Sequence, residues 1–244
     1  MPQNGSFLAF DTSTDVMSIA LTDGLRVWQH TGPGGAKASS TLIPAILTLL
    51  AQAGLALGDL QAIAFGRGPG SFTGLRTACA VAQGLAFGAQ RGMGGDGSMG
   101  IPVLPIDTLM AVAEEARLQK ESPHITALLD ARMDEMYVQR YACSQGLLSP
   151  LDDCELIRPE DLASDSATLY AGNVFEVYRG RLPEGLNKFN CLPTATSMLR
   201  LAPQLAASGH CVPAFMALPL YVRDKVALTT VEREQIKALK QQVA

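Results

Sequence analysis

Charged side chains are scarce in this sequence of 244 residues, of which Asp, Glu, Lys and Arg together make up 17%. The formal net charge is −4, so the chain lacks the positive excess with which a protein neutralises the phosphates of a nucleic acid. Hydrophobic residues nevertheless make up 48%, which is typical of a packed globular chain and not of a disordered one. The composition therefore excludes a protein that binds nucleic acid by itself, without a partner.

The usual signatures of metal, nucleophilic and membrane chemistry are also missing. The five cysteines contain no Cys-x-x-Cys pair, and His30, His124 and His210 lie far apart without a partner at metal-binding spacing. No Gly-x-Ser-x-Gly nucleophile elbow is present. The longest charge-free apolar stretch, Thr77–Gln90, is shorter than the roughly 20 residues that cross a bilayer, and Met1–Phe7 lacks the features of a signal peptide. We expect a soluble, cytoplasmic protein with reduced cysteines, no metal and no membrane contact.

What the sequence does contain is an alternation of short apolar runs and helical patterns. The predicted strands cover residues 7–11, 17–21, 25–30, 62–65, 102–106, 136–142 and 168–171, and the predicted helices cover 40–53, 72–90, 108–119 and 194–207. Asp23-Gly24 joins two of the strands as a hairpin turn. This order of elements predicts an α/β fold. The segment Arg91–Gly100 holds five glycines and is predicted to be a mobile surface insertion.

The second half of the chain repeats a pattern of the first. Three positions recur at a constant offset of 119: Asp11 with Asp130 (130 − 11), Asp15 with Asp134 (134 − 15), and Met17 with Met136 (136 − 17). In each half an apolar strand ends in an acidic turn that leads to a second strand. The repeat predicts a duplicated domain, with halves at 1–119 and 120–225 and a C-terminal helix or tail at 226–244. Chance recurrence of three positions is the alternative.

The two acidic turns are the first candidates for chemistry. A strand that ends in Asp11-Thr12-Ser13-Thr14 can present amides and hydroxyls to a phosphate, with the aspartate orienting a metal or a water. Duplicated halves with Asp11 and Asp130 at facing turns are the architecture of actin-like ATPases, which makes an ATPase or small-molecule kinase using these two residues one hypothesis. Ser13 stands where such turns usually carry glycine. The alternative is that both acids only cap their turns.

The segment Gly66–Arg76 is the richest in turn and cap signals. Pro69-Gly70 suits the centre of a type II turn, and Ser71 suits the N-cap of the helix that follows. The helix start can take an anion, but no Lys-Ser or Lys-Thr follows the glycines as in a P-loop. Small residues from Gly74 and Ala78 onward let another helix approach closely, inside the domain or across an interface. The first hundred residues hold only ten charged side chains, which favours burial of this half against a partner.

Four motifs occur in an order that resembles a known family: Leu8–Thr14, Gly68–Arg76, Asp130–Tyr137 and Pro219–Arg223. Together they resemble the TsaB (YeaZ) family, the bacterial accessory subunit for threonylcarbamoyladenosine in tRNA, over about residues 6 to 225. The resemblance implies a duplicated actin-like (ASKHA) fold with two βββαβα-type halves. It also implies an inactive paralogue of TsaD, the subunit that modifies adenosine 37 of tRNA.

From the resemblance we expect an interaction subunit without a catalytic site or a cofactor. It would bind a TsaD-type transferase together with a TsaE-type ATPase, form a homodimer when alone, and meet tRNA only through the complex. TsaD carries a metal site with two histidines on a helix, and the corresponding segment Lys37–Pro44 has none. A peptidase, suggested by the old glycoprotease label of the superfamily, has no visible nucleophile–base pair or metal site here.

The resemblance also assigns roles to individual residues. The helices at about 40–53 and 72–90 are expected to form the dimer and partner contact. The predicted interface residues are Gly70, Ser71, Phe72, Thr73, Gly74, Arg76, Thr77 and Ala78, and the predicted vestigial nucleotide-binding residues are Asp11, Thr12, Ser13, Thr14 and Asp130.

Overall fold

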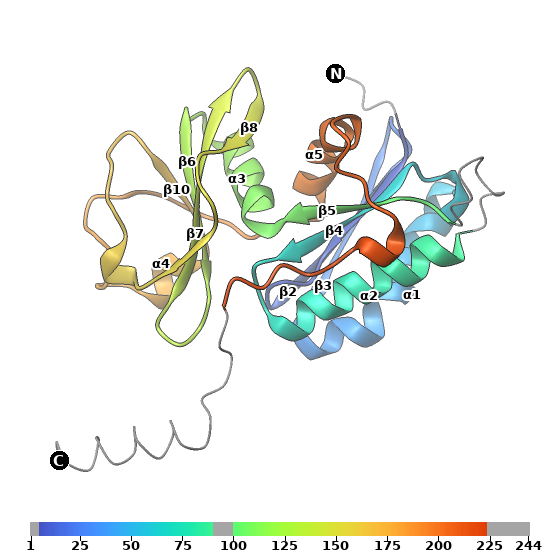
Figure 1. Cartoon of the computed structure of the whole chain (residues 1–244), viewed down its shortest axis with the longest axis horizontal. Coiled ribbons are helices and arrows are strands. Elements are labelled where there is room, and N and C mark those ends of the chain that lie inside the picture. Colours follow the sequence, from blue (N-terminus) through green and yellow to red (C-terminus); the bar gives the residue numbers. More distant parts are fainter. Residues whose placement is uncertain (1–4, 90–99, 224–244) are drawn as a thin grey trace, which may run out of the picture.

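The computed structural model describes residues 5–89 and 100–223, which form two β-sheets with helices on their faces (Figure 1). The first sheet has the order β3-β2-β1-β4-β5, in which β1 pairs antiparallel with β2 and parallel with β4. Its strands are β1 (Phe7–Asp11), β2 (Val16–Thr22), β3 (Val27–Pro33), β4 (Ala62–Gly68) and β5 (Val103–Asp107). The predicted insertion, apart from Gly100, and the predicted tail at 226–244 lie outside the described residues.

The second sheet repeats this topology. Its order is β11-β10-β6-β7-β8, with β9 also paired to β7, so that β6 takes the place of β1 between an antiparallel and a parallel neighbour. Its strands are β6 (His124–Asp130), β7 (Met136–Ser144), β8 (Leu147–Pro150), β9 (Glu155–Ile157), β10 (Leu169–Gly172) and β11 (Asn187–Asn190). The predicted duplication is confirmed. Each half ends with one further strand that is followed by a helix.

The helices form three layers around the two sheets. Helices α1 (Ala38–Ala53) and α2 (Phe72–Gly88) cover the outer face of the first sheet, whereas α3 (Thr108–Gln119) and α5 (Ala195–Ala207) lie between the sheets (Figure 1). Among the described residues, the outer face of the second sheet carries only the single turn α4 (Val174–Val177) and a 3-10 helix, η3 (Pro159–Asp161). The remaining 3-10 helices are η1 (Gly35–Lys37), η2 (Leu57–Asp59) and η4 (Ala214–Met216). The second half is therefore a repeat with its outer helices shortened.

The two central helices each pack on the sheet of the other half. Helix α3 follows β5 in the chain but contacts β6 and β7, and α5 follows β11 but contacts β1 and β2. The amide of Ala195 donates to the Ser18 hydroxyl at 2.9 Å, which fixes the start of α5 against β2. One core cluster accordingly contains the inner faces of both sheets together with both helices. The predicted boundary between residues 1–119 and 120–225 separates the sheets but passes through this shared core.

A buried ion cluster joins α3 to α5. The Glu114 side chain is 3% exposed, and its carboxylate forms ion pairs with Arg117 Nε at 2.7 Å and with Arg200 Nε at 3.2 Å. Beside it, the Glu115 carboxylate accepts from the Ser197 hydroxyl at 2.6 Å. Burial raises the pKa of Glu115, but hydrogen bonds from Ser197 and Thr194 and the charge of Arg200 outweigh it and hold the pKa below its ordinary value. The layer between the sheets is thus held by paired charges as well as by apolar packing.

Candidate functional site between the two halves

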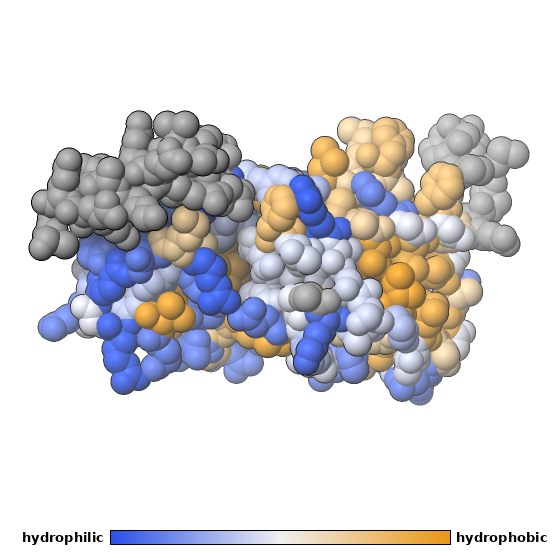
Figure 2. Space-filling model, turned by 90° about the horizontal axis from the view of Figure 1, so that it is seen from below, coloured by the Kyte–Doolittle hydropathy of each residue, from blue (hydrophilic) through white to orange (hydrophobic). Residues whose placement is uncertain are grey.

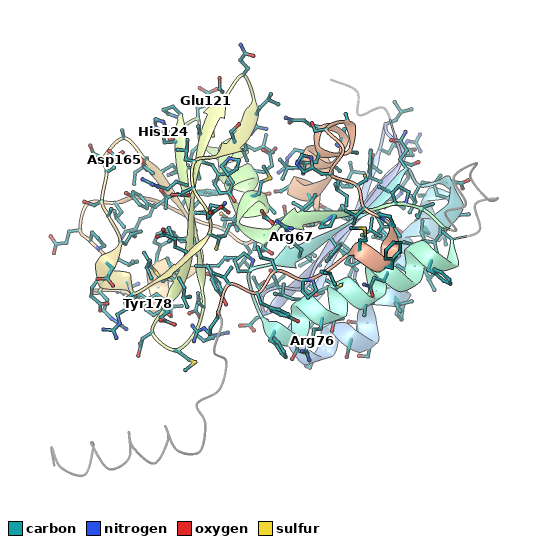
Figure 3. All side chains as sticks on the ribbon, viewed as in Figure 1. Arg67, Arg76, Glu121, His124, Asp165 and Tyr178 are labelled. Carbon is teal, nitrogen blue, oxygen red and sulfur yellow. The ribbon has the colours of Figure 1, made fainter. Side chains whose placement is uncertain are left out.

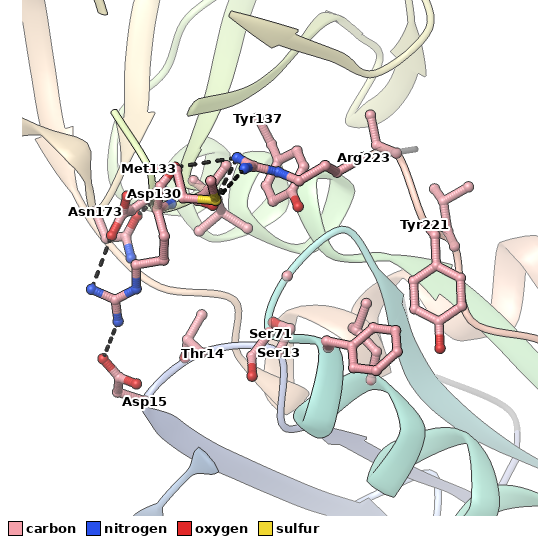
Figure 4. Close-up of a pocket in the computed structure, with 18 residues that line it drawn as sticks. Ser13, Thr14, Asp15, Ser71, Asp130, Met133, Tyr137, Asn173, Tyr221 and Arg223 are labelled. Carbon is pink, nitrogen blue, oxygen red and sulfur yellow. Dashed lines mark hydrogen bonds and ion pairs between the residues drawn. The ribbon is translucent and has the colours of Figure 1, made fainter. Parts of the chain in front are cut away.

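A cavity of about 310 Å³, here called the cleft, opens between the ends of β1 and β6 (Figure 4). It is lined by residues of four segments: 13–15 of the first acidic turn, 70–72 and 75 at the start of α2, 129–133, 137 and 173 of the second half, and 220–223 near the C-terminus. Arg132 reaches across to Asp15, with 2.9 Å between nitrogen and oxygen. Both side chains are mostly exposed, so this ion pair stabilises the closed cleft only weakly.

Asp11 does not line the cleft, because its side chain is fully buried beneath the first turn. Its Oδ1 accepts from the backbone amide of Ser13 at 2.9 Å and from the Ser13 hydroxyl at 2.7 Å, and its Oδ2 has no hydrogen-bond partner among the described residues. Burial raises the pKa of Asp11 to about 6, although the two hydrogen bonds from Ser13 oppose that rise. Asp11 therefore shapes the turn and is not placed to meet a ligand.

The other residues of the first turn are largely occupied by the fold. The Thr12 hydroxyl donates to the Gly74 carbonyl at 2.7 Å, and the Ser13 carbonyl accepts from the Ser71 amide at 2.7 Å. The Thr14 hydroxyl is within hydrogen-bond distance of the Val16 backbone. Of the predicted nucleotide-binding residues, the structure brings Ser13, Thr14 and Asp130 to the cleft, and it leaves Asp11 and Thr12 beneath it.

The two aspartates of the repeat are not equivalent in the sheets. Met136 pairs directly with Asp130 across its hairpin, whereas Asp11 pairs with Ser18, the residue after Met17. When Met17 and Met136 are taken as equivalent, β1 and β6 are thus displaced by one residue relative to each other. A displacement of one residue along a strand turns a side chain to the opposite face of the sheet. The alignment of Asp11 with Asp130 is therefore wrong as a structural equivalence.

Asp130 lines the cleft, and its carboxylate already has partners within the second half. The Tyr178 hydroxyl donates to its Oδ1 at 2.7 Å, the Arg132 amide donates at 2.9 Å, and Arg132 Nη1 lies 3.2 Å from Oδ2. The Asp130 side chain is 5% exposed. Burial raises the pKa of Tyr178, and its bond to Asp130 raises it further, so the phenol stays protonated and donates. An incoming metal ion or phosphate would have to displace these partners.

The second acidic turn has an unusual backbone. Arg132, Met133 and Asp134 all have positive φ, at 60°, 55° and 63°, although glycine is the residue that adopts this conformation without strain. Arg223 supports the turn: its Nη2 donates to the Ala131 carbonyl at 3.1 Å and to the Arg132 carbonyl at 3.2 Å. Three consecutive strained residues are a feature of functional or over-determined sites.

Residues 217–223 form a strap from α2 to the second turn. The Ala217 carbonyl accepts from Gln83 Nε2 at 2.8 Å, and the Leu220 amide donates to the Arg67 carbonyl at 2.7 Å. The Tyr221 ring lies 5.2 Å from that of Phe72, and its hydroxyl accepts from Arg76 Nε at 3.1 Å. Arg223 completes the strap with an ion pair to Glu135 at 2.7 Å. The sequence indicated this segment only through the family resemblance, because its hydropathy has no helical or strand period.

The start of α2 places the predicted interface residues on two sides. Ser71 caps the helix as expected, because its hydroxyl accepts a hydrogen bond from the Gly74 amide at 3.5 Å. Ser71, Phe72, Thr73 and Arg76 are exposed, and Gly70 and Thr77 are half-buried. Gly74 and Ala78 are buried against the first sheet within the same chain. In the chain alone these two small residues admit the backbone at Thr12 and the core beneath α2, so their exposed neighbours carry the part of the predicted interface that is open to contact.

The predicted type II turn at Pro69-Gly70 is also wrong. Gly70 has φ of +159°, far from the value near +80° that the third residue of a type II turn requires, and the Gly68–Pro69 peptide bond is cis. A side chain on Gly70 would overlap Ser13. The glycine is therefore required by the close approach of the loop to the first acidic turn.

Two glycines of α2 give a matched test of this arrangement. A methyl group on Gly74 would overlap the backbone carbonyl of Thr12, whereas one on Gly84 would meet nothing within 4 Å. We expect Gly74→Ala to lower the free energy of unfolding by about 1–3 kcal/mol and Gly84→Ala to raise it by about 0.5–1 kcal/mol. Urea denaturation measures both, and equal effects of the two substitutions would contradict the placement of Gly74.

The outer side of α1 and α2 is apolar and almost free of charge. Ile43, Leu47, Phe72 and Phe87 are 41%, 51%, 41% and 63% exposed, and this set is here called the α1–α2 face. Helix α1 has no charged residue, and Arg76 is the one charged residue of α2. Apolar residues gather over this end of the molecule, at the right of Figure 2. Exposed apolar patches of this kind mark interaction sites in folded proteins.

Within residues 5–89 and 100–223, no group of three His, Cys, Asp or Glu side chains is arranged to hold a metal ion. All five cysteines are free. In the same part of the chain no helix has the length and apolar character needed to cross a membrane.

Two lobes of the same topology, with strand order 3-2-1-4-5 and a cleft between them, define an actin-like protein. A family model described as "TsaD: tRNA N6-adenosine threonylcarbamoyltransferase" matches residues 33–210. The tRNA threonylcarbamoyladenosine biosynthesis protein TsaB of Escherichia coli (strain K12) is 30% identical over 230 residues, which cover 90% of this chain and 95% of that protein. The protein of the same name from Haemophilus influenzae is 32% identical over 237 residues, with 92% and 96% covered. The chain belongs to the TsaB (YeaZ) family.

Solved structures agree with this assignment. YeaZ from Pseudomonas aeruginosa superimposes with a TM-score of 0.78 at 37% identity, covering 89% of this chain and 99% of that one. A second structure from the same organism, with a TM-score of 0.79 at 37% identity, is described as similar to peptidase YEAZ and is covered completely. The duplicated actin-like fold predicted from the sequence is thereby confirmed.

Proposed function

We propose that this chain is a non-catalytic interaction subunit of the complex that makes N6-threonylcarbamoyladenosine at position 37 of tRNA. In this role it binds and supports a TsaD-type transferase, and tRNA reaches it only through the complex. The observation that carries the proposal is the α1–α2 face, a charge-poor apolar surface on a chain whose family is named for threonylcarbamoyladenosine biosynthesis. The mild negative charge of the chain fits a subunit whose partner holds the RNA.

The state of the cleft supports a role without chemistry. Asp11 is buried outside the cavity, and Asp130 has its oxygens bound to Tyr178 and Arg132. An actin-like ATPase or kinase that used both aspartates would need them to face one ligand. Calorimetry with ATP and magnesium tests this alternative, and binding with turnover that is lost in Asp130→Ala would favour it over the proposal.

We further propose that the α1–α2 face serves two occupants in turn. A second copy of the chain covers it when the protein is alone, and the TsaD-type subunit replaces that copy in the complex, to which a TsaE-type ATPase is added. Among the predicted interface residues, Phe72, Thr73 and Arg76 are exposed beside this face and are available for contact. Because one occupant or the other covers this apolar face, it is not exposed to water either in the chain alone or in the complex.

Charge placed on the α1–α2 face tests the proposal. Leu47→Arg and Phe87→Arg each put a cation in the centre of an apolar contact, so we expect the affinity for the cell's own TsaD-type subunit to fall by about tenfold or more. Leu25→Arg is the matched control, because Leu25 is 89% exposed in the β2–β3 turn and is not part of this face. Calorimetric titration of the purified subunits measures the effect. Unchanged binding in both face variants, or transferase activity of this chain alone on tRNA, would refute the proposal.

A further inference from the structure

A second cavity, of about 460 Å³, opens on the outer face of the second sheet and is here called the outer cavity. Its floor is the outward side of β6 and β7, including Thr126, Val138 and Arg140, and its walls are the segments 151–157 and 161–165. His124 and Asp165 mark its rim in Figure 3, on the side of the sheet away from α3. The outer cavity is separated from the cleft, with which it shares no lining residue.

The internal repeat shows what fills the corresponding place in the first half. Met17 and Met136 are equivalent in β2 and β7, so Val138 corresponds to Ile19 and Arg140 to Leu21. Ile19 and Leu21 are fully buried in one cluster with residues of α1, a helix of 16 residues. In the second half the segment that corresponds to α1 is η3, which has three residues. The outer cavity is therefore the place of a missing helix.

The floor of the cavity has changed in keeping with that loss. Leu8 pairs with Leu21 on the buried first sheet, and the corresponding pair on the second sheet is Thr126 with Arg140. Val138, which takes the place of Ile19, is half-buried. The surface is thus partly polar and lies in contact with solvent, so a purely apolar helix would not fit it as α1 fits the first sheet.

Carboxylates dominate the walls. Five line the cavity, namely Asp152, Asp153, Glu155, Asp161 and Asp165, against the single guanidinium of Arg140 and the imidazole of His124. Asp152 is paired with Arg140, and Asp165 accepts from the Ala167 amide at 2.9 Å. Asp153, Glu155 and Asp161 are exposed and take part in no ion pair with the part of the chain that the structure describes. A cationic partner surface would complement these three charges.

We infer that the outer cavity is a docking site for a lysine- or arginine-rich helix of a partner protein. The helix occupies the position of the absent α1 counterpart, with its apolar side on Val138 and Ile157 and its cations toward Asp153, Glu155 and Asp161. This mode is that of an amphipathic helix in a groove, with charge complementarity that favours basic partners and disfavours nucleic acid. The inference goes beyond the proposed function, which concerns the opposite end of the molecule.

A synthetic probe tests the inference on the full-length chain. The probe is a fluorescein-labelled 14-residue amphipathic helix built of leucine and lysine, titrated by fluorescence anisotropy. We expect saturable binding that weakens by about tenfold or more in the Asp153→Lys/Glu155→Lys double variant. The control is Glu176→Lys/Glu184→Lys, which makes the same change of charge on the second half outside the cavity, and its affinity should change less than about threefold. Asp161→Lys is a single variant for the cavity, and it should also weaken binding of the probe.

Three outcomes would overturn the inference. No binding of the probe would do so, as would equal losses in the cavity and control variants. Carbodiimide cross-linking of the probe-free chain joins lysines to nearby carboxylates, and cross-links from Lys237 or Lys240 to Asp153 or Glu155 would show that the chain's own C-terminal segment is the occupant instead. Binding of the TsaD-type subunit should be the same in all cavity variants, so failure here is distinguishable from failure of the proposed function.

Discussion

Replacing Glu114 with alanine is expected to lower the free energy of unfolding by about 3 to 4 kcal/mol. Glu114 is the acceptor for both Arg117 and Arg200, and its side chain is 3% exposed. Its removal takes the ion-pair acceptor from Arg117 and leaves Arg200 with Glu115 alone, although both guanidinium groups are only about a quarter exposed. Removal of one partner from a buried charge cluster costs more than the net stabilisation that the intact cluster provides.

Urea denaturation followed by circular dichroism measures this effect. Glu114→Gln keeps the volume and one acceptor oxygen, so about half of the loss is expected there, which separates charge from packing. Glu121→Ala is the surface control on the loop after α3, where the side chain is exposed and a change within about 0.5 kcal/mol is expected. If Glu114→Ala were as mild as Glu121→Ala, the ion cluster would not be what holds α3 to α5.

The second large effect concerns Asp11 and depends on pH. Burial raises the pKa of Asp11 from its ordinary value of 3.8 to about 6 in the folded chain. The folded state therefore binds more protons than the unfolded state between these values, and stability is lost as the pH rises through them. A difference of about 2 pH units corresponds to about 3 kcal/mol that the ionised carboxylate costs at neutral pH.

Asn at position 11 removes the ionisation while keeping the shape of the side chain. The stability of Asp11→Asn relative to the natural chain should therefore rise by about 2.4 kcal/mol between pH 4 and pH 7, with all other carboxylates common to both proteins. Denaturation midpoints at a series of pH values measure this difference. Ser13→Ala is the companion variant: it removes the hydroxyl donor that lowers the pKa of Asp11, so the loss of stability should extend to higher pH. A relative stability that stays flat from pH 4 to pH 7 would contradict the burial of an ionisable Asp11.

The sequence predicted the elements whose signals are local. Helix α3 was expected at residues 108–119 and is found at Thr108–Gln119, because a helical pattern begins directly after a strand there. The Asp23-Gly24 hairpin and the Ser71 cap were predicted for the same reason, since the turn chemistry lies in the residues themselves. In contrast, β11 (Asn187–Asn190) was not predicted, because its polar, largely exposed residues form an edge strand without alternation.

What the sequence could not predict depends on contacts between distant segments. Equal spacing of Asp11 and Asp130 from the methionines suggested two equivalent acids, but the pairing across each hairpin, which sequence spacing does not specify, displaces them by one residue. Gly74 and Ala78 are another case, because small residues on a helix do not reveal which neighbour comes close. The strap is a similar case: Tyr221 and Arg223 are positioned by Phe72 and Glu135, which lie far away in sequence.

The exchange of the central helices has a consequence for how the chain is made. The inner face of the first sheet, including Phe7 and Ala9, is covered by α5, which begins at Ala195. A ribosome that has completed β1 must therefore synthesise more than 180 further residues (195 − 11 = 184) before that face can be buried. Contacts of such long sequence separation slow folding and leave apolar surface open to aggregation during synthesis. The inner face of the N-terminal sheet is thus completed only by residues of the C-terminal half.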